Sequence, residues 1–575
     1  MTFKESTPFP VVGFAAVGAA GLILGFLGAG LPLWMVAAGL AGIALLVAAI
    51  ARPEIALTGL LAGAPLISWK APGPLPVDSV VIGIALLLTA AGLDYLRHGE
   101  SAKSGAYALP LALFLSIGAV SLIFALDRLE GATVWMRYAG YFLLVFAVAR
   151  AVRSRDHLVA YAGIALVAAA VSALFGLEQY LNRPDLSIGM AGLDLSIKGR
   201  IAGTYENPNF FGEYLVLLIP LGIALALAPG SRARRASFGV LALILTVALV
   251  LTYTRGSWLS LALGLAVFAL LTKRWLLWVF GAAALAALAA LPGIASRLLS
   301  SFDLSQGTGA FRLKLWRIPA QMIADHPVLG VGLGNYLATF TEYVFRDPNL
   351  SVGWVQYGAH NSYLTIWAET GTLGLLAFLL VAGAALRSVI SLHRRVAGKD
   401  PFIQYVNAAL AAGITGFLFN SMTSNSLLHP RAAVFFWILI GLQLGLSRLA
   451  PETAERRVSR LLDGSLLAGW VRGVIPSLKA GALSSQALRP LLAVADARSG
   501  SRLLQRLFAY PPGYSAISGS RVAGWGIAVF DGARRLAAGS GAAAALSGIA
   551  GRPALSLGSY FLCGVAAYAL GTILL

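Results

Sequence analysis

The sequence predicts an all-α, polytopic membrane protein. Of its 575 residues, 58% are hydrophobic and only 12% are charged, and the mean hydropathy is +0.80. A soluble domain carries about 25% charged residues. Apolar runs of about 18 residues or more also recur along the chain, and each is long enough to cross a bilayer as a helix.

About 12–14 of these runs are expected to be transmembrane helices. The first apolar run, from Val11 to Ile50, is too long for a cleavable signal and is expected to form a helical hairpin. The predicted spans lie near residues 9–27, 31–50, 55–69, 78–93, 106–124, 134–150, 158–179, 210–228, 237–253, 257–272, 275–292, 362–386, 402–422 and 432–448.

The distribution of basic residues predicts the orientation of these spans. With the N-terminus in the cytoplasm, the inside loops hold 17 Lys and Arg residues and the short outside connections hold 8. This is the direction of the positive-inside rule. The polar interval 293–361 is left out of the count, because long loops cross a membrane largely regardless of charge. It is then a large external loop.

Two regions of different composition are expected. Residues 1–450 form a transmembrane core that includes the 293–361 loop. Residues 451–575 form a basic tail, in which 459–482 and 489–508 are expected to be amphipathic helices on the inner leaflet, and 557–575 is apolar enough to insert. The net charge of +19 is attributed to cytoplasmic loops and anionic membrane lipids, not to nucleic acid.

Neither a metal nor a cofactor is expected. The single cysteine, Cys563, excludes an intramolecular disulfide and a Cys-based metal site. No pair of histidines has the spacing of metal ligands. Most of the histidines outside the external loop fall in inside loops, and His429 is outside but isolated.

The first candidate site lies at the outer mouth of the span near 210–228. Here Arg200 precedes the run Glu-Asn207-Pro-Asn209. Asn207 or Asn209 can cap the helix, and a helix N-terminus beside an arginine suits a phosphate. Alternatively, the run is only a helix start and Arg200 is a surface residue that snorkels to the interface. An arginine on the outer side departs from the positive-inside bias, and this departure favours a functional role for Arg200.

Arg255 is the second candidate. It stands in Tyr253-Thr-Arg-Gly-Ser-Trp258, where two apolar runs meet with almost no loop between them. An ionisable residue so close to hydrocarbon usually faces a cavity or a partner. The alternative is an interfacial arginine beside an aromatic belt residue, Trp258. Because Arg200 is expected on the same side of the membrane, we favour a functional pair.

The external loop contains a predicted amphipathic helix from Ala310 to Ile323. Arg312 and Trp316 are four positions apart and share a face, so they are candidates for substrate binding. A helix lying on the outer leaflet explains them equally well. The run Gly-Val-Gly-Leu-Gly at 330–334 does not match a nucleotide-binding fingerprint. It is interpreted as a flexible turn region.

The last candidates follow the loop. His360 stands at the outer start of a membrane helix, where it can accept a proton near neutral pH or simply cap the helix. Tyr363 follows on its face, as packing or as a sugar platform. Glu369 lies on another face and is costly in lipid unless it has a partner. A structural role for Glu369 and a role in substrate binding both stay open.

Together these residues suit one chemistry. Two arginines can offset the charge that develops on a lipid-borne diphosphate. A histidine on the same side can position or deprotonate an acceptor hydroxyl.

Four stretches, in this order, resemble the O-antigen ligase-like family of bacterial membrane glycosyltransferases, which also includes polysaccharide polymerases. They are the R-x-x-G-T-x-x-N-P-N run from Arg200; Thr254-Arg-Gly256; Arg312 and Trp316 with His326-Pro-Val-Leu-Gly-Val-Gly-Leu-Gly; and His360-Asn-Ser-Tyr-Leu with Glu369-x-Gly-x-x-Gly374. The long basic tail and the number of spans depart from the family's compact pattern.

The resemblance implies a glycosyltransferase of the C type in the bacterial inner membrane, with a large periplasmic loop and no metal. It implies an undecaprenyl-diphosphate-linked glycan as donor, held by Arg200 and Arg255 at the periplasmic face. It also implies that His360 serves the acceptor.

The acceptor stays open between lipid A-core (a ligase), a growing glycan (a polymerase) and a protein hydroxyl. A transporter of a small solute such as bicarbonate is the alternative from another class. A transporter should place its polar residues near the bilayer midplane, whereas the candidates here cluster at one face. A non-catalytic scaffold for envelope assembly would not require Arg200, Arg255 and His360.

Overall fold

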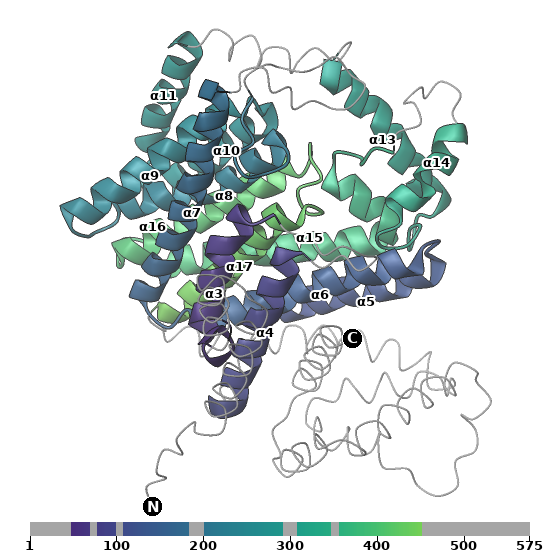
Figure 1. The fold of residues 1–575 in the computed structure, drawn as a ribbon, viewed down its shortest axis with the longest axis horizontal. Helices are drawn as coiled ribbons and strands as arrows, with labels where there is room; N and C mark the ends of the chain where they lie inside the picture. Colours follow the sequence, from purple (N-terminus) through teal and green to yellow (C-terminus); the bar gives the residue numbers. More distant parts are fainter. Residues whose placement is uncertain are drawn as a thin grey trace, which may run out of the picture. The chain divides into compact units, whose positions relative to one another are not determined.

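The fold is seen in a computed structural model, which describes residue 46 and residues 48–68, 78–98, 107–182, 200–290, 307–346 and 356–450. Within these ranges the elements are helices (Figure 1). They are α3 (Pro53–Leu66), α4 (Ser79–His98), α5 (Ala108–Ser121), η2 (Leu122–Phe124), α6 (Arg128–Ala151), α7 (Arg155–Asn182), α8 (Pro208–Leu227), α9 (Arg232–Leu251), α10 (Arg255–Leu271), α11 (Leu276–Ala290), α13 (Gly307–Asp325), α14 (Tyr336–Arg346), α15 (Ser362–Val396), α16 (Pro401–Asn420) and α17 (Pro430–Leu449).

The predicted class, an all-α polytopic membrane protein, is confirmed. In the described part of the chain, α6 to α9 and α15 to α17 are the seven helices that are long and apolar enough to cross a membrane. Shorter apolar helices coincide with α3, α4, α5, α10 and α11. The predicted span near 9–27, most of that near 31–50, and the tail 451–575 lie outside the described residues.

Helices α8, α16 and α17 form the centre of the bundle. Helix α16 packs against α8, α10 and α17, and α17 also packs against α6. Small residues permit this close packing: a Cβ added at Gly413 would lie 2.8 Å from the carbonyl oxygen of Leu217, and one at Gly264 would lie 2.6 Å from that of Ala412. Glycines therefore bring the α8, α10 and α16 backbones together.

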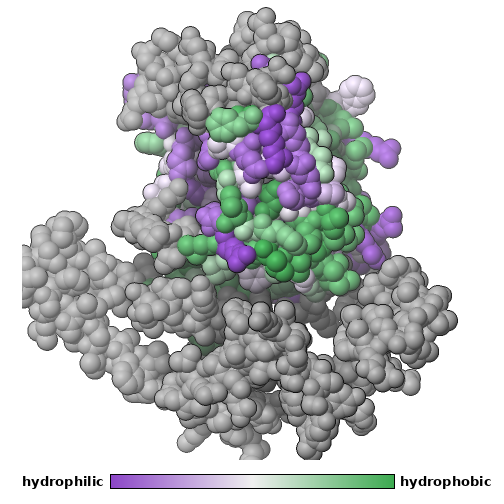
Figure 2. Space-filling view, turned by 90° about the vertical axis from the view of Figure 1, so that its right-hand side faces the viewer, coloured by the Kyte–Doolittle hydropathy of each residue, from purple (hydrophilic) through white to green (hydrophobic). Residues whose placement is uncertain are grey.

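The outer helices present apolar side chains to their surroundings. Leu243 on α9 and Leu285 on α11 are well exposed, and Trp278 on α11 is 82% exposed. On the face shown in Figure 2, hydrophilic residues gather toward the top and hydrophobic ones below them. Exposed apolar side chains on long helices are typical of lipid contact and need no protein partner.

The described part of the interval 293–361 is built from two helices. Helix α13 contains the predicted helix 310–323 and extends to Asp325, and both helices pack against α15 (Figure 1). Helix α14 was not predicted. Its buried residues Tyr336, Phe340 and Tyr343 follow the i, i+4, i+7 spacing of an amphipathic helix, which is the signal that could have identified it.

Candidate functional site

The segments that carry the candidate residues meet at one end of the helix bundle. The backbone N–H of Ile201 donates to the carbonyl of Leu251 (3.2 Å), which joins the segment before α8 to the end of α9. The backbone N–H of Ser362 donates to the carbonyl of Ser421 (2.8 Å), which joins the start of α15 to the end of α16. A Cβ added at Gly256, next to Arg255, would lie 2.8 Å from Thr423 Oγ1, just after α16. The segments that carry the arginines and the histidine therefore lie at the same end.

Arg200 links the start of α8 to the turn between α9 and α10. Its Nε donates to the carbonyl of Thr252 (2.9 Å), and a terminal nitrogen donates to Asn209 Oδ1 (3.0 Å) and Thr254 Oγ1 (3.2 Å). Asn207 is the N-cap of α8, because its side chain accepts from the backbone N–H of Asn209 (2.8 Å). The asparagine pair thus caps the helix and orients the arginine.

Arg312, on α13, is the centre of the charged groups. Its electrostatic neighbours include Arg255, at the start of α10, and Glu213 of α8, and Arg312 itself acts on His360. Burial, followed by the positive charge of Arg255, lowers the pKa of Arg312 to about 10. The guanidinium therefore keeps its charge at neutral pH. Arg255, Arg312 and His360 come from three separate elements and form one cluster, called the cationic cluster after its two charged arginines.

His360 is held in a strained backbone conformation and in its neutral form. Its φ is 48°, and Tyr253, two residues before Arg255, has a φ of 51°; they are the two non-glycine residues with positive φ in the described ranges. Such strain often clusters at functional sites. Burial, followed by the charge of Arg312, lowers the pKa of His360 to about 4, so near pH 7 the imidazole can accept a proton.

Trp316 fixes the segment that leads to His360. Its indole N–H donates to the carbonyl of Ala359 (3.0 Å), the residue directly before the histidine. Phe311 packs edge-on against Tyr357, with ring centroids 5.2 Å apart. The shared face of α13 predicted from the sequence therefore points to the 357–360 segment and positions it.

Tyr363 and Glu369 make their hydrogen bonds to backbone groups of neighbouring elements. The Tyr363 hydroxyl donates to the carbonyl of Leu418 (2.8 Å) on α16. Glu369 is 3% exposed, and its Oε1 accepts from the backbone N–H of Tyr336 (3.1 Å) at the start of α14. Glu369 therefore has the hydrogen-bond partner that a structural role requires. Both residues tie α15 to neighbouring elements around the site.

The glycine run at 330–334 is a tightly packed turn, which differs from the flexible region predicted. Gly330, Gly332 and Gly334 have φ values of 69°, 103° and 76°. The backbone N–H of Gly332 donates to the Glu369 carbonyl (3.0 Å). Gly371, with φ 66°, kinks α15 at this contact, and an added Cβ there would lie 2.1 Å from the carbonyl oxygen of Val328. Close backbone packing therefore requires these glycines.

Glu213 is a site residue that the sequence prediction missed. It is fully buried in α8, and its carboxylate accepts a hydrogen bond from the hydroxyl of Ser424, between α16 and α17. It also acts electrostatically on Arg312. An acid within the apolar run that follows Asn209 was the available signal, since such residues need partners.

The prediction that His429 is isolated is wrong. Its ring lies on that of Phe210, with centroids 3.8 Å apart, and its Nε2 is 3.3 Å from Glu206 Oε2. This hydrogen bond is the largest of the effects that lower the pKa of Glu206 to about 2. Beside it, Arg431 donates to the carbonyls of Ala64, Pro65 and Thr204. These contacts join residues more than 200 positions apart, which a linear sequence does not reveal.

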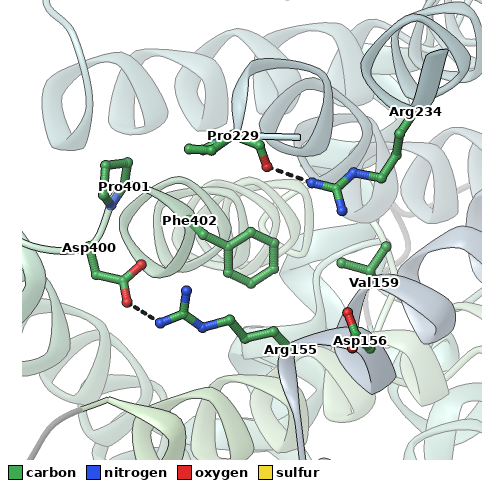
Figure 3. A pocket seen from close by; sticks show the side chains of 8 residues that line it. All are labelled: Arg155, Asp156, Val159, Pro229, Arg234, Asp400, Pro401 and Phe402. Carbon is green, nitrogen blue, oxygen red and sulfur yellow. Dashed lines mark hydrogen bonds and ion pairs between the residues drawn. The ribbon is translucent and has the colours of Figure 1, made fainter. Parts of the chain in front are cut away.

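A separate pocket of about 250 Å³ lies at the other helix ends (Figure 3). Residues near the starts of α7, α9 and α16 line it, among them Arg155 and Arg234. Arg155 pairs with Asp400, and Arg234 donates to the carbonyl of Pro229. Its acidic and basic side chains balance one another, so it does not repeat the cationic cluster of the first site.

Comparison with known proteins relates part of the chain to O-antigen ligases. Residues 240–379 match a family model described as O-antigen ligase. The chain is also 28% identical over 181 residues to the O-antigen ligase of Salmonella typhimurium, across 29% of this chain and 43% of that protein. Over these residues the chain is similar to O-antigen ligases.

The predicted resemblance is thereby confirmed. The span matched to this O-antigen ligase-like family includes Arg255, Arg312 and His360, whereas Arg200 lies ahead of it. The chain aligns with less than half the length of the Salmonella protein.

Proposed function

We propose that this protein is a membrane glycosyltransferase of cell-surface polysaccharide assembly. It would transfer a glycan from undecaprenyl diphosphate to a hydroxyl acceptor, lipid A-core in the ligase case, at the periplasmic face of the bacterial inner membrane. The observation that carries the proposal is the cationic cluster, in which the charge of Arg255 acts on Arg312 and the charge of Arg312 acts on His360.

The cluster suits a diphosphate leaving group. Arginine presents a planar fork of donors that matches phosphate oxygens. Arg255, at the start of α10, and Arg312, on α13, supply two such forks. Arg200 braces the turn that carries Arg255, through its bonds to Thr252 and Thr254. Donors fixed before the reaction stabilise charge that develops in the transition state.

The proposed step is a displacement at the anomeric carbon of the lipid-linked glycan. The acceptor hydroxyl oxygen forms a bond to this carbon while the bond from the carbon to the diphosphate oxygen breaks. The electron pair of that bond leaves on undecaprenyl diphosphate, where the arginines offset its charge. The hydroxyl proton passes to the imidazole of His360, which its lowered pKa keeps unprotonated at neutral pH. The negative charge of the bound diphosphate raises the basicity of this imidazole when the donor is present.

A polymerase of the same family would use the same cluster with a growing glycan as acceptor. The transporter alternative is disfavoured by the location of the charged residues. Arg200 and His360 lie in the segments before α8 and α15, and Arg255 is the first residue of α10, whereas a transporter site is expected near the bilayer midplane on broken helices.

The test is a comparison of surface glycans in a deletion strain complemented with single variants. Arg200→Ala, Arg255→Ala and His360→Ala are each expected to abolish transfer at normal protein abundance. Polymer that accumulates on the lipid carrier identifies a ligase, and single repeat units identify a polymerase. Full activity in all three variants contradicts the site, and a normal glycan profile with altered solute uptake supports a transporter.

A further inference from the structure

Glu213 is a fully buried acid inside α8. This helix is long and apolar enough to span a membrane. A charged side chain in such a helix is costly unless it is partnered, and such residues usually have a functional reason to be there. The contacts of the two carboxylate oxygens indicate that reason.

The first oxygen connects α8 to the backbone that carries His360. Oε1 accepts from the hydroxyl of Ser424. The carbonyl of Ser424 in turn accepts from the backbone N–H of Ser362 (3.0 Å) and from its hydroxyl (2.9 Å). Ser362 is the first residue of α15, two positions after the histidine. A single serine therefore links the acid to the start of α15.

The second oxygen, Oε2, has no hydrogen bond within the described ranges. Glu213 Oε2 and Arg312 Nε are both buried, and within the described ranges neither has a hydrogen-bond partner. Burial and the charge of Arg255 both oppose the charge of Arg312, whereas Glu213 favours it. Two arginines held close together repel one another, and an acid behind one of them offsets this repulsion.

We propose that Glu213 is a positioning residue, which holds the charged guanidinium of Arg312 beside Arg255 so that both cations engage the donor diphosphate. The inference rests on the proposed function and adds to it the residue that keeps the cluster assembled. Glu213 acts through Arg312 and does not itself touch the substrate, because its side chain has no exposed surface.

The test is a double-mutant cycle on binding of undecaprenyl diphosphate to the full-length protein in lipid nanodiscs. Glu213→Gln keeps the shape of the side chain and removes its charge, so it is expected to raise the Kd about tenfold, within the range of couplings between neighbouring charges. Arg312→Ala is expected to raise the Kd at least as much. The double variant is expected to bind like Arg312→Ala alone, because the acid acts through that arginine.

Two controls separate this effect from general damage. Asp94 is another buried acid, paired with Arg150 at the opposite end of the bundle, and Asp94→Asn is expected to leave the Kd unchanged. Thermal unfolding of each variant shows whether it is folded. An unchanged Kd in Glu213→Gln, or a double variant whose loss is the product of the two single losses, overturns the inference. Failure of the wild-type protein to bind the probe overturns the proposed function itself.

Discussion

At the scale of single residues, His360 gives the sharpest prediction. His360→Gln is expected to lower the rate of transfer by roughly 100- to 10,000-fold, the usual contribution of a general base. The matched control is His326→Gln, since His326 is exposed at the end of α13 and is expected to leave the rate unchanged. The measurement is transfer from a purified lipid-linked donor at equal protein amounts. Equal rates in the two variants would contradict the assignment.

The pKa of His360 has a second consequence. Because burial lowers it to about 4, the imidazole stays neutral at about pH 5.5, where a free histidine is mostly protonated. The unfolded chain binds this proton first as the pH falls, so the folded state loses stability between about pH 6.5 and 4. His360→Gln is expected to remove that part of the pH dependence of thermal unfolding. An unchanged pH profile would show that the imidazole titrates normally.

Trp316 tests whether α13 positions the histidine. Trp316→Phe keeps an aromatic ring and removes the hydrogen bond to Ala359, which is worth about 1 kcal/mol. Transfer is expected to fall about tenfold with little change in unfolding temperature, because misplacement of a catalytic group lowers the rate steeply. Trp278→Phe, on the exposed face of α11, is the control. Equal activity of Trp316→Phe and Trp278→Phe would mean that the Trp316 side chain contributes packing alone and that its hydrogen bond has no role in transfer.

At the scale of elements, the kink in α15 gives a prediction about stability. Gly371→Ala places a Cβ against the Val328 carbonyl at a positive φ, and is expected to lower the free energy of unfolding by about 1–3 kcal/mol. Gly383→Ala, in the same helix with nothing within 4 Å of its Cβ, is expected to be neutral or stabilising by up to about 1 kcal/mol. Thermal unfolding in detergent compares them, and equal stabilities would show that the kink is not required.

The sequence reveals elements whose signal is local. The length of the hydrophobic runs predicted the membrane spans, and the four-residue spacing of Arg312 and Trp316 predicted α13. The glycine run at 330–334 was interpreted as flexible because glycine permits unusual φ values. Its rigidity comes from α15, whose Glu369 carbonyl it contacts, and this contact appears only when the two segments meet in the fold.

At the scale of the whole molecule, charge against an apolar background was the informative signal. Arg255 and His360 stood out because they interrupt or flank membrane spans, and the structure brings their segments to one end. Glu213 did not stand out, because its partners Ser424 and Arg312 lie on other helices. The partners of a buried charge depend on packing, so they require the three-dimensional structure.

The orientation of the bundle in the membrane is the remaining whole-molecule prediction, since the structure shows that the candidate residues share an end and the basic loops predict which side it faces. Ala338 on α14 and Ala233 on α9 are both exposed, at the predicted outer and inner ends. In a Cys563→Ser background, Ala338→Cys is expected to react with a membrane-impermeant maleimide in intact spheroplasts. Ala233→Cys is expected to react only after lysis. The reverse pattern would place the cationic cluster in the cytoplasm, away from a periplasmic acceptor, because both alanines belong to the same helix bundle as His360.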